Sequence, residues 1–344
     1  MGNPKFAINP LKSLLASNHD IVAVISNPPK AMGRKKILQH TDVGKYALNN
    51  NLNLIELDDF NNIDIFRKIS SLKVDIFVVV AFRILPKKYI ELPKIGSINI
   101  HASLLPKYRG AAPIQWALMN GDNVTGVSIF QIEKKIDTGG IIHVEKIKIK
   151  DEDNFETLSD KLSDLGSKAL IKSLGLIENN DFKLLLQDNK KSTRAPKIKK
   201  EMLRINWSWE AKKINNWIRG LSPFPGMYTV YKGKKLKIFK TSVVHNDKEL
   251  SIGKIEVINL KELLVHCVDK MISVLEVQQE GKKRLSIQDF LKGSNIKNAL
   301  LKKSNLDVSL MSTVLEYCSS YLRSNKWKIC KDSVSENKKI NIFN

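Results

Sequence analysis

The sequence predicts an α/β protein in which a domain with a mostly parallel sheet is followed by a smaller, all-β domain. Up to about residue 150, short β-branched apolar runs alternate with helical stretches, which is typical of a parallel sheet with helices on both faces. After about residue 207, short runs of alternating polarity are separated by glycine turns, which indicates a small barrel or sandwich.

The composition is that of a globular protein. The chain has 344 residues, of which 42% are hydrophobic and 27% charged, and this length favours two domains. No apolar run approaches the roughly 20 residues of a membrane span, and the N-terminal residues do not resemble a secretory signal. Three scattered cysteines fit a reducing compartment and structural roles. We expect a soluble, monomeric, cytoplasmic protein without membrane contact.

The formal net charge is +22, which is large for a chain of this size. A charge of this size predicts attraction to a polyanion, and it favours nucleic acid over a membrane surface as the partner. An abundance of lysine that reflects genome composition is the competing explanation, so charge alone leaves the partner open.

The first domain is predicted element by element. Helices are expected at 10–18, 43–51 and 154–177, and buried strands at 20–26, 74–82, 96–102 and 126–132. In such sheets ligands bind beyond the carboxyl ends of the strands, and His101 lies at one of these ends.

A polar, basic stretch over 188–206 is expected to be a linker, followed by a helix within 209–221 and strands within 226–244, 253–268 and 270–280.

Three side chains stand where strands are expected to end. Asn99 and His101 are two residues apart on one strand, so they share a face about 6.6 Å apart along it. Asp137 lies in a glycine-bounded turn, D-T-G-G, after the strand at 126–132. An amide can donate to a developing oxyanion, an imidazole can move a proton, and a carboxylate can fix the imidazole tautomer and favour its protonated form. The three together predict acyl transfer to a nucleophile that belongs to the substrate.

Each of these residues alone is more simply a strand-end or turn residue, and the prediction rests on the set. No G-x-S-x-G nucleophile elbow is present, which disfavours a covalent acyl-enzyme.

The segment 99–142, N-I-H-A-S-L-L-P through I-D-T-G-G-I-I, resembles the signature region of the folate-dependent formyltransferases, in the branch that formylates methionyl initiator tRNA. The resemblance runs from residue 1 to about 293. It implies a Rossmann-like catalytic domain over 1–187, the linker at 188–206, an OB-like tRNA-binding domain over 207–293 and a tail of unknown structure over 294–344.

The resemblance implies that the enzyme transfers the formyl group of 10-formyltetrahydrofolate, its co-substrate, to the free amino group of methionyl initiator tRNA, without a metal. Asn99, His101 and Asp137 match the catalytic triad of the family. The residues that match its folate site are Ser103, Leu104, Leu105, Pro106, Phe82, Arg83 and Ile84. The residues expected to contact tRNA are Arg34, Lys35, Lys36, Lys197, Lys199 and Lys200.

The chain departs from the family pattern in two regions. The family's M-G-T-P segment normally follows a first strand, whereas here Met1 is the methionine of that motif. We therefore expect either a start upstream, which we favour, or a damaged fold, because a missing central strand leaves backbone groups of its neighbours unpaired. Arg83 stands where many relatives have glycine, and Pro29, His40 and Asp42 make the loop expected to contact the acceptor stem atypical.

The second domain argues against a glycinamide formyltransferase, which would resemble the first domain alone. Two alternatives stay open. An amino-sugar formyltransferase would share the three side chains but is disfavoured by the basic second domain. A catalytically idle RNA-binding protein would explain the charge and the small barrel. The intact set of Asn99, His101 and Asp137 disfavours it.

Overall fold

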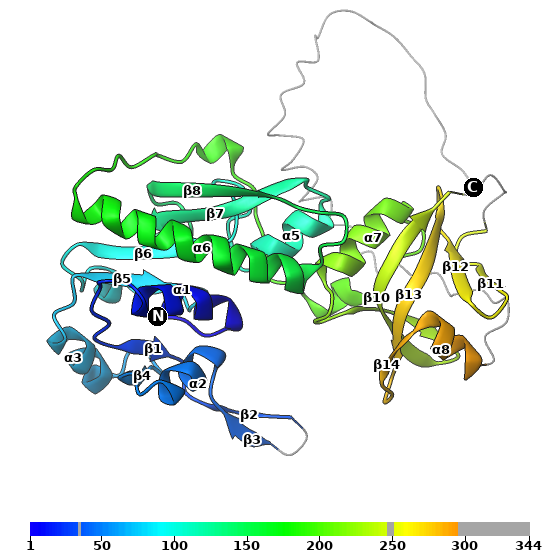
Figure 1. The fold of residues 1–344 in the computed structure, drawn as a ribbon, viewed down its shortest axis with the longest axis horizontal. Helices are drawn as coiled ribbons and strands as arrows, with labels where there is room; N and C mark the ends of the chain where they lie inside the picture. Colours follow the sequence, from blue (N-terminus) through cyan, green and yellow to red (C-terminus); the bar gives the residue numbers. More distant parts are fainter. Residues whose placement is uncertain (34–35, 246–250, 295–344) are drawn as a thin grey trace, which may run out of the picture. The chain divides into compact units, whose positions relative to one another are not determined.

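The first domain is organised by a sheet that is divided into two parts (Figure 1). The computed structural model describes residues 1–33, 36–245 and 251–294. The smaller part pairs β1 (Val24–Ser26) with β4 (Leu54–Glu56), and these strands are parallel. The larger part has the order β5-β6-β7-β8, formed by β5 (Ile76–Val79), β6 (Gly96–His101), β7 (Val124–Gln131) and β8 (Ile141–Lys148). β5 and β6 are parallel, whereas β7 and β8 are antiparallel to their neighbours, so the expected parallel sheet carries an antiparallel edge.

Met1 and Gly2 lie between the two parts of the sheet. The Gly2 amide donates to the Ile25 carbonyl at 3.0 Å, and the Val80 amide donates to the Met1 carbonyl at 2.8 Å. Gly2 also forms a parallel bridge with Val80. A Cβ on Gly2 would come within 2.9 Å of the Ala7 Cβ, so only glycine fits this crossing without a shift. Two residues therefore stand where a doubly wound sheet has a central strand.

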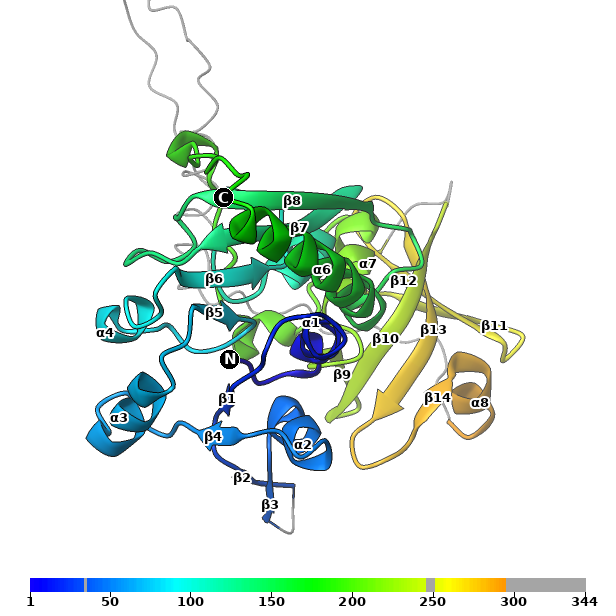
Figure 2. The same ribbon diagram turned by 60° about the vertical axis from the view of Figure 1, so that its left-hand side comes forward.

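Helices cover both parts of the sheet. They are η1 (Lys5–Ala7), α1 (Ile8–Leu15), α2 (Asp42–Asn49), α3 (Ile63–Ser71), α4 (Lys87–Ile90), α5 (Pro113–Met119) and α6 (Phe155–Glu178). Helix α6 lies across β7 and β8 and contacts α1, as both ribbon views show (Figure 2). The helix that the apolar periodicity of this stretch predicted is confirmed, and it begins at a capping box in which Asn154 and Thr157 satisfy each other's backbone amides.

A hydrophobic cluster joins the smaller and the larger part of the sheet. Its buried members are Ile25, Ile55, Leu57, Ile69, Phe77, Val79, Leu85 and Tyr89, and Met1 packs against them. Because the cluster draws on β1, β4, α3 and β5, it ties the pieces together where backbone pairing is limited to Met1 and Gly2.

A short hairpin follows β1. It pairs β2 (Lys30–Met32) with β3 (Ile37–Gln39) in antiparallel register, and Ile37 and Leu38 are exposed. Of the three residues expected to contact the acceptor stem, Lys36 is exposed directly before β3, and Arg34 and Lys35 fall outside the described residues.

The second domain is a curved antiparallel sheet. Helix α7 (Ala211–Gly220) precedes strands with the order β11-β12-β13-β10-β9, and β14 pairs with β13. The strands are β9 (Met227–Tyr231), β10 (Lys234–Val244), β11 (Ile255–Ile258), β12 (Glu262–His266), β13 (Met271–Gln279) and β14 (Arg284–Ser286), and α8 (Ile287–Lys292) follows. Side chains of β9 and β11, from opposite ends of this order, line one small apolar cavity, so the sheet curls around its core as the alternating pattern predicted.

The expected linker is in close contact with the first domain and contains η2 (Asn189–Lys191) and η3 (Lys200–Leu203). The Arg109 amide donates to the Thr193 carbonyl at 2.9 Å, and the Ala195 amide donates to the Arg109 carbonyl at 2.7 Å. The Trp116 indole donates to the Pro196 carbonyl at 2.8 Å. A Cβ on Gly110 would lie 2.7 Å from the Ala195 carbonyl oxygen. Within the expected linker, 193–196 is thus bonded along the loop that follows β6, a set of contacts that composition did not indicate.

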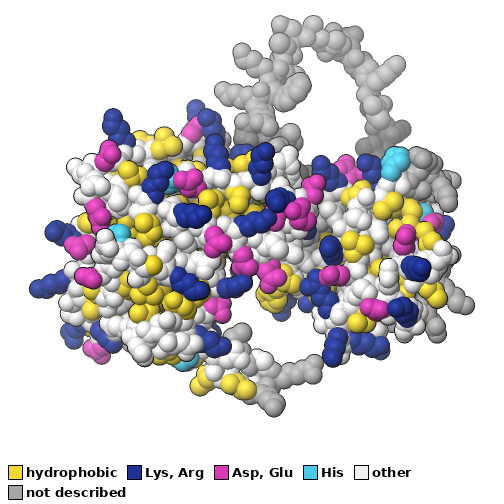
Figure 3. Space-filling model, viewed as in Figure 1, with side chains coloured by type: hydrophobic (Ala, Val, Ile, Leu, Met, Phe, Trp, Pro, Cys, Tyr) yellow, Lys and Arg dark blue, Asp and Glu magenta, His cyan; other side chains and the backbone are white. Residues whose placement is uncertain are grey.

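Charged side chains are mixed on the surface. Figure 3 shows Lys and Arg spread over one face, with Asp and Glu among them. Within the described residues, no helix is both long and apolar enough to cross a bilayer. Burial raises the pKa of the Cys267 thiol to about 12, which fits a structural cysteine. The other two cysteines, Cys318 and Cys330, lie outside the described residues.

Adding an apolar, strand-forming segment before Met1 is expected to raise the melting temperature, because it supplies backbone partners between β1 and β5. It also removes a buried amine: the Met1 α-amine donates to the Val78 carbonyl, and burial lowers its pKa from 8.0 to about 5. Between these pH values the unfolded chain binds more protons than the folded one, so the stability of the 344-residue chain rises from pH 5 to pH 8. Thermal melts of both chains across this range test the expectation. Equal melting temperatures, or the same pH dependence in both chains, would contradict it.

Candidate active site

The predicted site lies at the carboxyl end of β6, beside the ends of β5 and β7. β6 places Asn99 opposite Phe130 and His101 opposite Ser128 of β7, and Asn99 pairs with Val79 of β5. After His101 the chain turns sharply, with the Ser103 amide donating to the His101 carbonyl at 2.9 Å. The loop that follows folds back over the strand end and supplies the partners of the imidazole.

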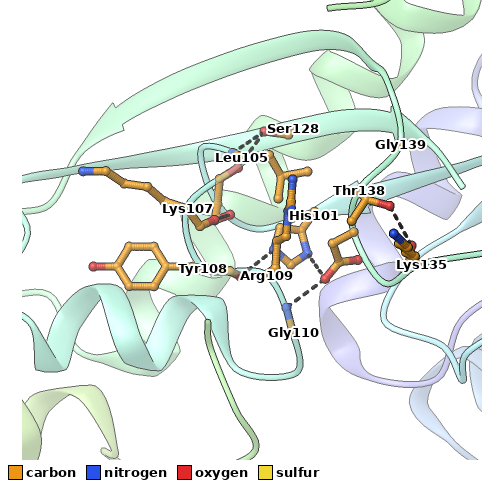
Figure 4. A network of polar contacts seen from close by, with 12 residues as sticks. His101, Leu105, Lys107, Tyr108, Arg109, Gly110, Ser128, Lys135, Thr138 and Gly139 are labelled. Atoms are coloured by element: carbon orange, nitrogen blue, oxygen red, sulfur yellow. Dashed lines mark hydrogen bonds and ion pairs between the residues drawn. The ribbon is translucent and has the colours of Figure 1, made fainter. Parts of the chain in front are cut away.

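His101 is buried, and one of its ring nitrogens is already occupied (Figure 4). Its Nε2 lies 2.9 Å from the Tyr108 carbonyl oxygen. A carbonyl only accepts, so Nε2 carries the proton of the neutral ring and Nδ1 holds the free lone pair. The Tyr108 backbone is itself held, because its amide donates to Thr193 Oγ1 at 2.9 Å. The expectation that Asp137 fixes the tautomer is therefore wrong: a backbone carbonyl does.

Asp137 faces the other nitrogen of the ring. Its Oδ2 lies 3.8 Å from His101 Nδ1, beyond hydrogen-bond distance, and accepts from the Gly110 amide at 2.8 Å. The carboxylate thus faces the ring without a hydrogen bond to Nδ1, which keeps its lone pair. Asp137 has a φ of 53°, a left-handed backbone conformation that non-glycine residues rarely adopt. Strain of this kind persists where surrounding contacts enforce it.

Asn99 has an unused hydrogen-bonding atom. Its Oδ1 is buried and has no hydrogen-bond partner among the described residues. Leaving such an atom unpaired costs about 1–3 kcal/mol, which is typical of a site built for a ligand. The structure therefore brings Asn99, His101 and Asp137 to one cavity, although Asn99 does not contact the other two through any hydrogen bond described for them.

The cavity has a volume of about 710 Å³, within the range of small-molecule sites. Its walls come from the segment 81–85 after β5, the end of β6, the turn 133–137 and the start of α6. Lys134 and Lys135 lie on the rim and are exposed. The second domain adds Pro223 and Phe224 from the segment between α7 and β9, and Phe224 is 74% exposed. The cavity thus combines an apolar interior with a rim that carries both charge and an aromatic ring.

The residues expected in the folate site fall into two groups. Phe82, Arg83 and Ile84 line the cavity. Ser103, Leu104, Leu105 and Pro106 are absent from its lining: Ser103 is fully buried and donates to the Lys107 carbonyl, and Leu105 packs with Phe130 and Ile141. The Leu105 amide donates to Ser128 Oγ, which in turn donates to the Ser103 carbonyl. Ser103 to Pro106 therefore support the loop that holds His101, and their part in folate binding stays a prediction.

The charged group of Arg83 is bound to the protein's own backbone. Its guanidinium donates to the carbonyls of Leu57 and Asp58, at 2.5 and 2.8 Å, and stacks 4.4 Å from the Phe60 ring. The arginine that replaces the family's glycine thus fastens the loop after β5 to the end of β4.

The lysines expected to contact tRNA are on the surface. Lys197, Lys199 and Lys200 are exposed along the linker, and Lys36 is exposed directly before β3. None of these four lysines lines the cavity. Their part in binding stays a prediction.

Comparisons with known proteins agree with this geometry. Residues 1–174 match the family described as "Formyl transferase", and residues 197–295 match "Formyl transferase, C-terminal domain". Curated methionyl-tRNA formyltransferases of Alkaliphilus oremlandii and Caldicellulosiruptor saccharolyticus are 39% and 42% identical to the chain. Each alignment covers 86% of this chain and 96% of the relative.

The chain belongs to the methionyl-tRNA formyltransferase family. Among solved structures, the fold is similar to that of an N-formyltransferase from Helicobacter canadensis in complex with folinic acid and dTDP-3-aminofucose, with a TM-score of 0.60 and 24% identity over 79% of this chain and 97% of that one. The sugar 3N-formyl transferase WlaRD gives a TM-score of 0.59 and 23% identity, over 82% of this chain and 97% of that one. These likenesses confirm the predicted fold class of this family member.

Sequence reasoning missed three contributors to the site. The Tyr108 carbonyl accepts from His101, and the Gln187 side chain donates to the carbonyls of Asp137 and Gly139. Contacts to backbone carbonyls leave no signature in residue type. Phe224 reaches the cavity from the second domain, and the signal that points to it is an aromatic side chain held between two prolines, Ser-Pro-Phe-Pro.

Replacing Asn99 or His101 by alanine is expected to lower the turnover of formyl transfer about 100- to 1,000-fold, because each change removes a group aimed at the reacting carbonyl. Steady-state kinetics with folate binding measured in parallel test this. Asn61→Ala, an exposed asparagine outside the cavity, is the matched control. Near-parental turnover of both site variants, with unchanged folate binding, would contradict the assignment.

Proposed function

We propose that this chain transfers the formyl group of 10-formyltetrahydrofolate to the α-amino group of methionyl initiator tRNA, in the cytoplasm, with Asn99, His101 and Asp137 as its catalytic residues. The observation that carries the proposal is the convergence on one cavity of substrate size of three groups: Asn99, whose buried Oδ1 has no described partner, the His101 imidazole with one free nitrogen, and the Asp137 carboxylate. The relatives that bear this name, aligned along nearly their whole length, support the choice of substrate.

The geometry suggests a sequence of proton movements. The uncharged amine attacks the formyl carbon, and the Asn99 carboxamide donates to the oxyanion that forms. His101 Nδ1 takes a proton from the amine, because Nε2 already donates its proton to Tyr108. Asp137, 3.8 Å away, stabilises the resulting imidazolium. The same proton then passes to the folate N10 as the bond between carbon and nitrogen breaks, so that His101 returns to its neutral form.

The folate would occupy the apolar interior, and the acceptor end of the tRNA would enter past the rim. Phe82, Ile84 and Leu85 offer an apolar wall to a pterin ring, and the loop that carries them is fixed by Arg83. Lys134 and Lys135 on the rim suit phosphates, and the exposed Phe224 ring suits stacking with a terminal base.

The purified chain is expected to formylate charged initiator tRNA with 10-formyltetrahydrofolate as donor. Elongator methionyl-tRNA is expected to react much more slowly, and nucleotide-linked amino sugars not at all. Formylated product separated from each acceptor measures the three rates under identical conditions. A faster reaction with an amino sugar would replace this proposal by the sugar alternative, and tRNA binding without any transfer would favour the idle RNA-binding protein.

Changing Lys197, Lys199 and Lys200 together to glutamine is expected to raise the KM for tRNA and to flatten its salt dependence. The reason is that removing one lysine–phosphate pair reduces the slope of log affinity against log salt by about 1. The KM for folate stays unchanged. The matched control changes Lys68, Lys73 and Lys94, which are exposed, and of which Lys73 and Lys94 flank the amino ends of β5 and β6. Equal salt slopes in the two triple variants would remove the linker lysines from the interface.

A further inference from the structure

We propose that Gln187 is a positioning residue for the reaction, because it holds the backbone of Asp137 in the conformation that presents the carboxylate to His101. This inference rests on the proposed function and names a residue that acts through Asp137, without contact to the reacting atoms.

Gln187 lies beside the Asp137 turn because the chain around it extends the sheet. Leu185 pairs with Ile141 at the start of β8, and each amide donates to the other's carbonyl at 2.9 Å. Two residues further on, the Gln187 side chain reaches the turn that precedes β8. Its Nε2 donates to the Asp137 carbonyl at 3.0 Å and to the Gly139 carbonyl at 2.8 Å. Both ends of the D-T-G turn are thus fastened by one amide group.

The orientation of this amide is set by Arg109. Gln187 Oε1 accepts from Arg109 Nε at 3.1 Å and from Arg109 Nη2 at 2.7 Å. A guanidinium only donates and carbonyls only accept, so a flipped amide would lose all four hydrogen bonds. Arg109 is fixed in turn, since its backbone is bonded on both sides to Thr193 and Ala195. Gln187 is therefore held in one orientation between the loop after β6 and the Asp137 turn.

Asp137 needs such support because of its backbone. Its φ of 53° is unfavourable for a residue with a side chain, and conformations of this kind cost about 1–3 kcal/mol. The only hydrogen bond described for the carboxylate comes from the Gly110 amide, next to Arg109 in the chain. Without the hydrogen bonds from Gln187, the turn is free to relax towards ordinary backbone conformations, and the carboxylate moves relative to His101 Nδ1.

Two variants separate positioning from stability. Gln187→Met removes all four hydrogen bonds. Gln187→Glu keeps acceptors for Arg109, places a carboxylate oxygen where the donor to Asp137 and Gly139 stood, and adds a negative charge. Both are expected to lower kcat about 10- to 100-fold, the effect of a displacement of about 1 Å at a catalytic group, with both KM values within a few-fold of the parent. The melting temperature is expected to fall less in Gln187→Glu than in Gln187→Met, because the glutamate keeps the hydrogen bonds from Arg109. Ser192→Ala is the control, because its hydroxyl donates only to the Asn189 carbonyl in the same linker.

A double-mutant cycle with Asp137→Asn decides whether Gln187 acts through the carboxylate. Once Asp137 is neutral, Gln187→Glu is expected to lower kcat by less than about three-fold further. A full additional loss in that background, or parental kcat in both single variants, would overturn the proposal. Hydrogen exchange at residues 138–140 gives a readout without activity: the amides there should exchange faster in Gln187→Glu than in the parent. An inactive parent would refute the proposed function alone, and unchanged exchange would refute the role of Gln187 alone.

Discussion

The hydrogen bond between His101 Nε2 and the Tyr108 carbonyl is the constraint on which the site depends. It decides which ring nitrogen is free, and it requires the loop after β6 to fold back over the end of its own strand. That fold is possible because the loop finds partners on two sides. Ser128 of β7 bonds Ser103 and Leu105 from one side, and the segment 193–195 bonds Tyr108 and Arg109 from the other. A buried imidazole that is held by backbone atoms loses little mobility when a substrate binds. Most of its conformational entropy is already lost when the protein folds.

Much of this arrangement follows from local pattern. The long helix, with its Asn154 cap, and β6, with Asn99 and His101 on one face, follow from side-chain periodicity and capping chemistry, which act over a few residues. The convergence of Asp137 on His101 follows from the rule that ligands collect at strand ends, helped by the resemblance of the motif to a known family. These predictions required no knowledge of contacts distant in sequence.

The rest depends on contacts between segments far apart in the chain. Ser103 and Leu105 look like part of a ligand-binding loop in sequence, and the contacts that bury them come from Ser128 and the cluster around Phe130, which lie more than 20 residues further along the chain. A basic, proline-containing stretch has the composition of a tether, yet its carbonyls and amides match those of 106–112. Backbone pairing of this kind is nearly independent of residue type, so no side-chain pattern announces it. The charge of Arg83 suggests a ligand contact, but the partners of its guanidinium are backbone carbonyls at the end of β4, which no side-chain pattern indicates.

The contact between 193–196 and the catalytic loop limits how this protein can be recombined. A hybrid joined at the end of α6 would receive Gln187, Thr193 and Ala195 from the other parent, and with them half of the framework around His101 and Asp137. A junction after Pro196 keeps that framework with its own catalytic domain. The boundary that matters for exchange between relatives thus lies past the segment that looks, from composition, like the place to cut.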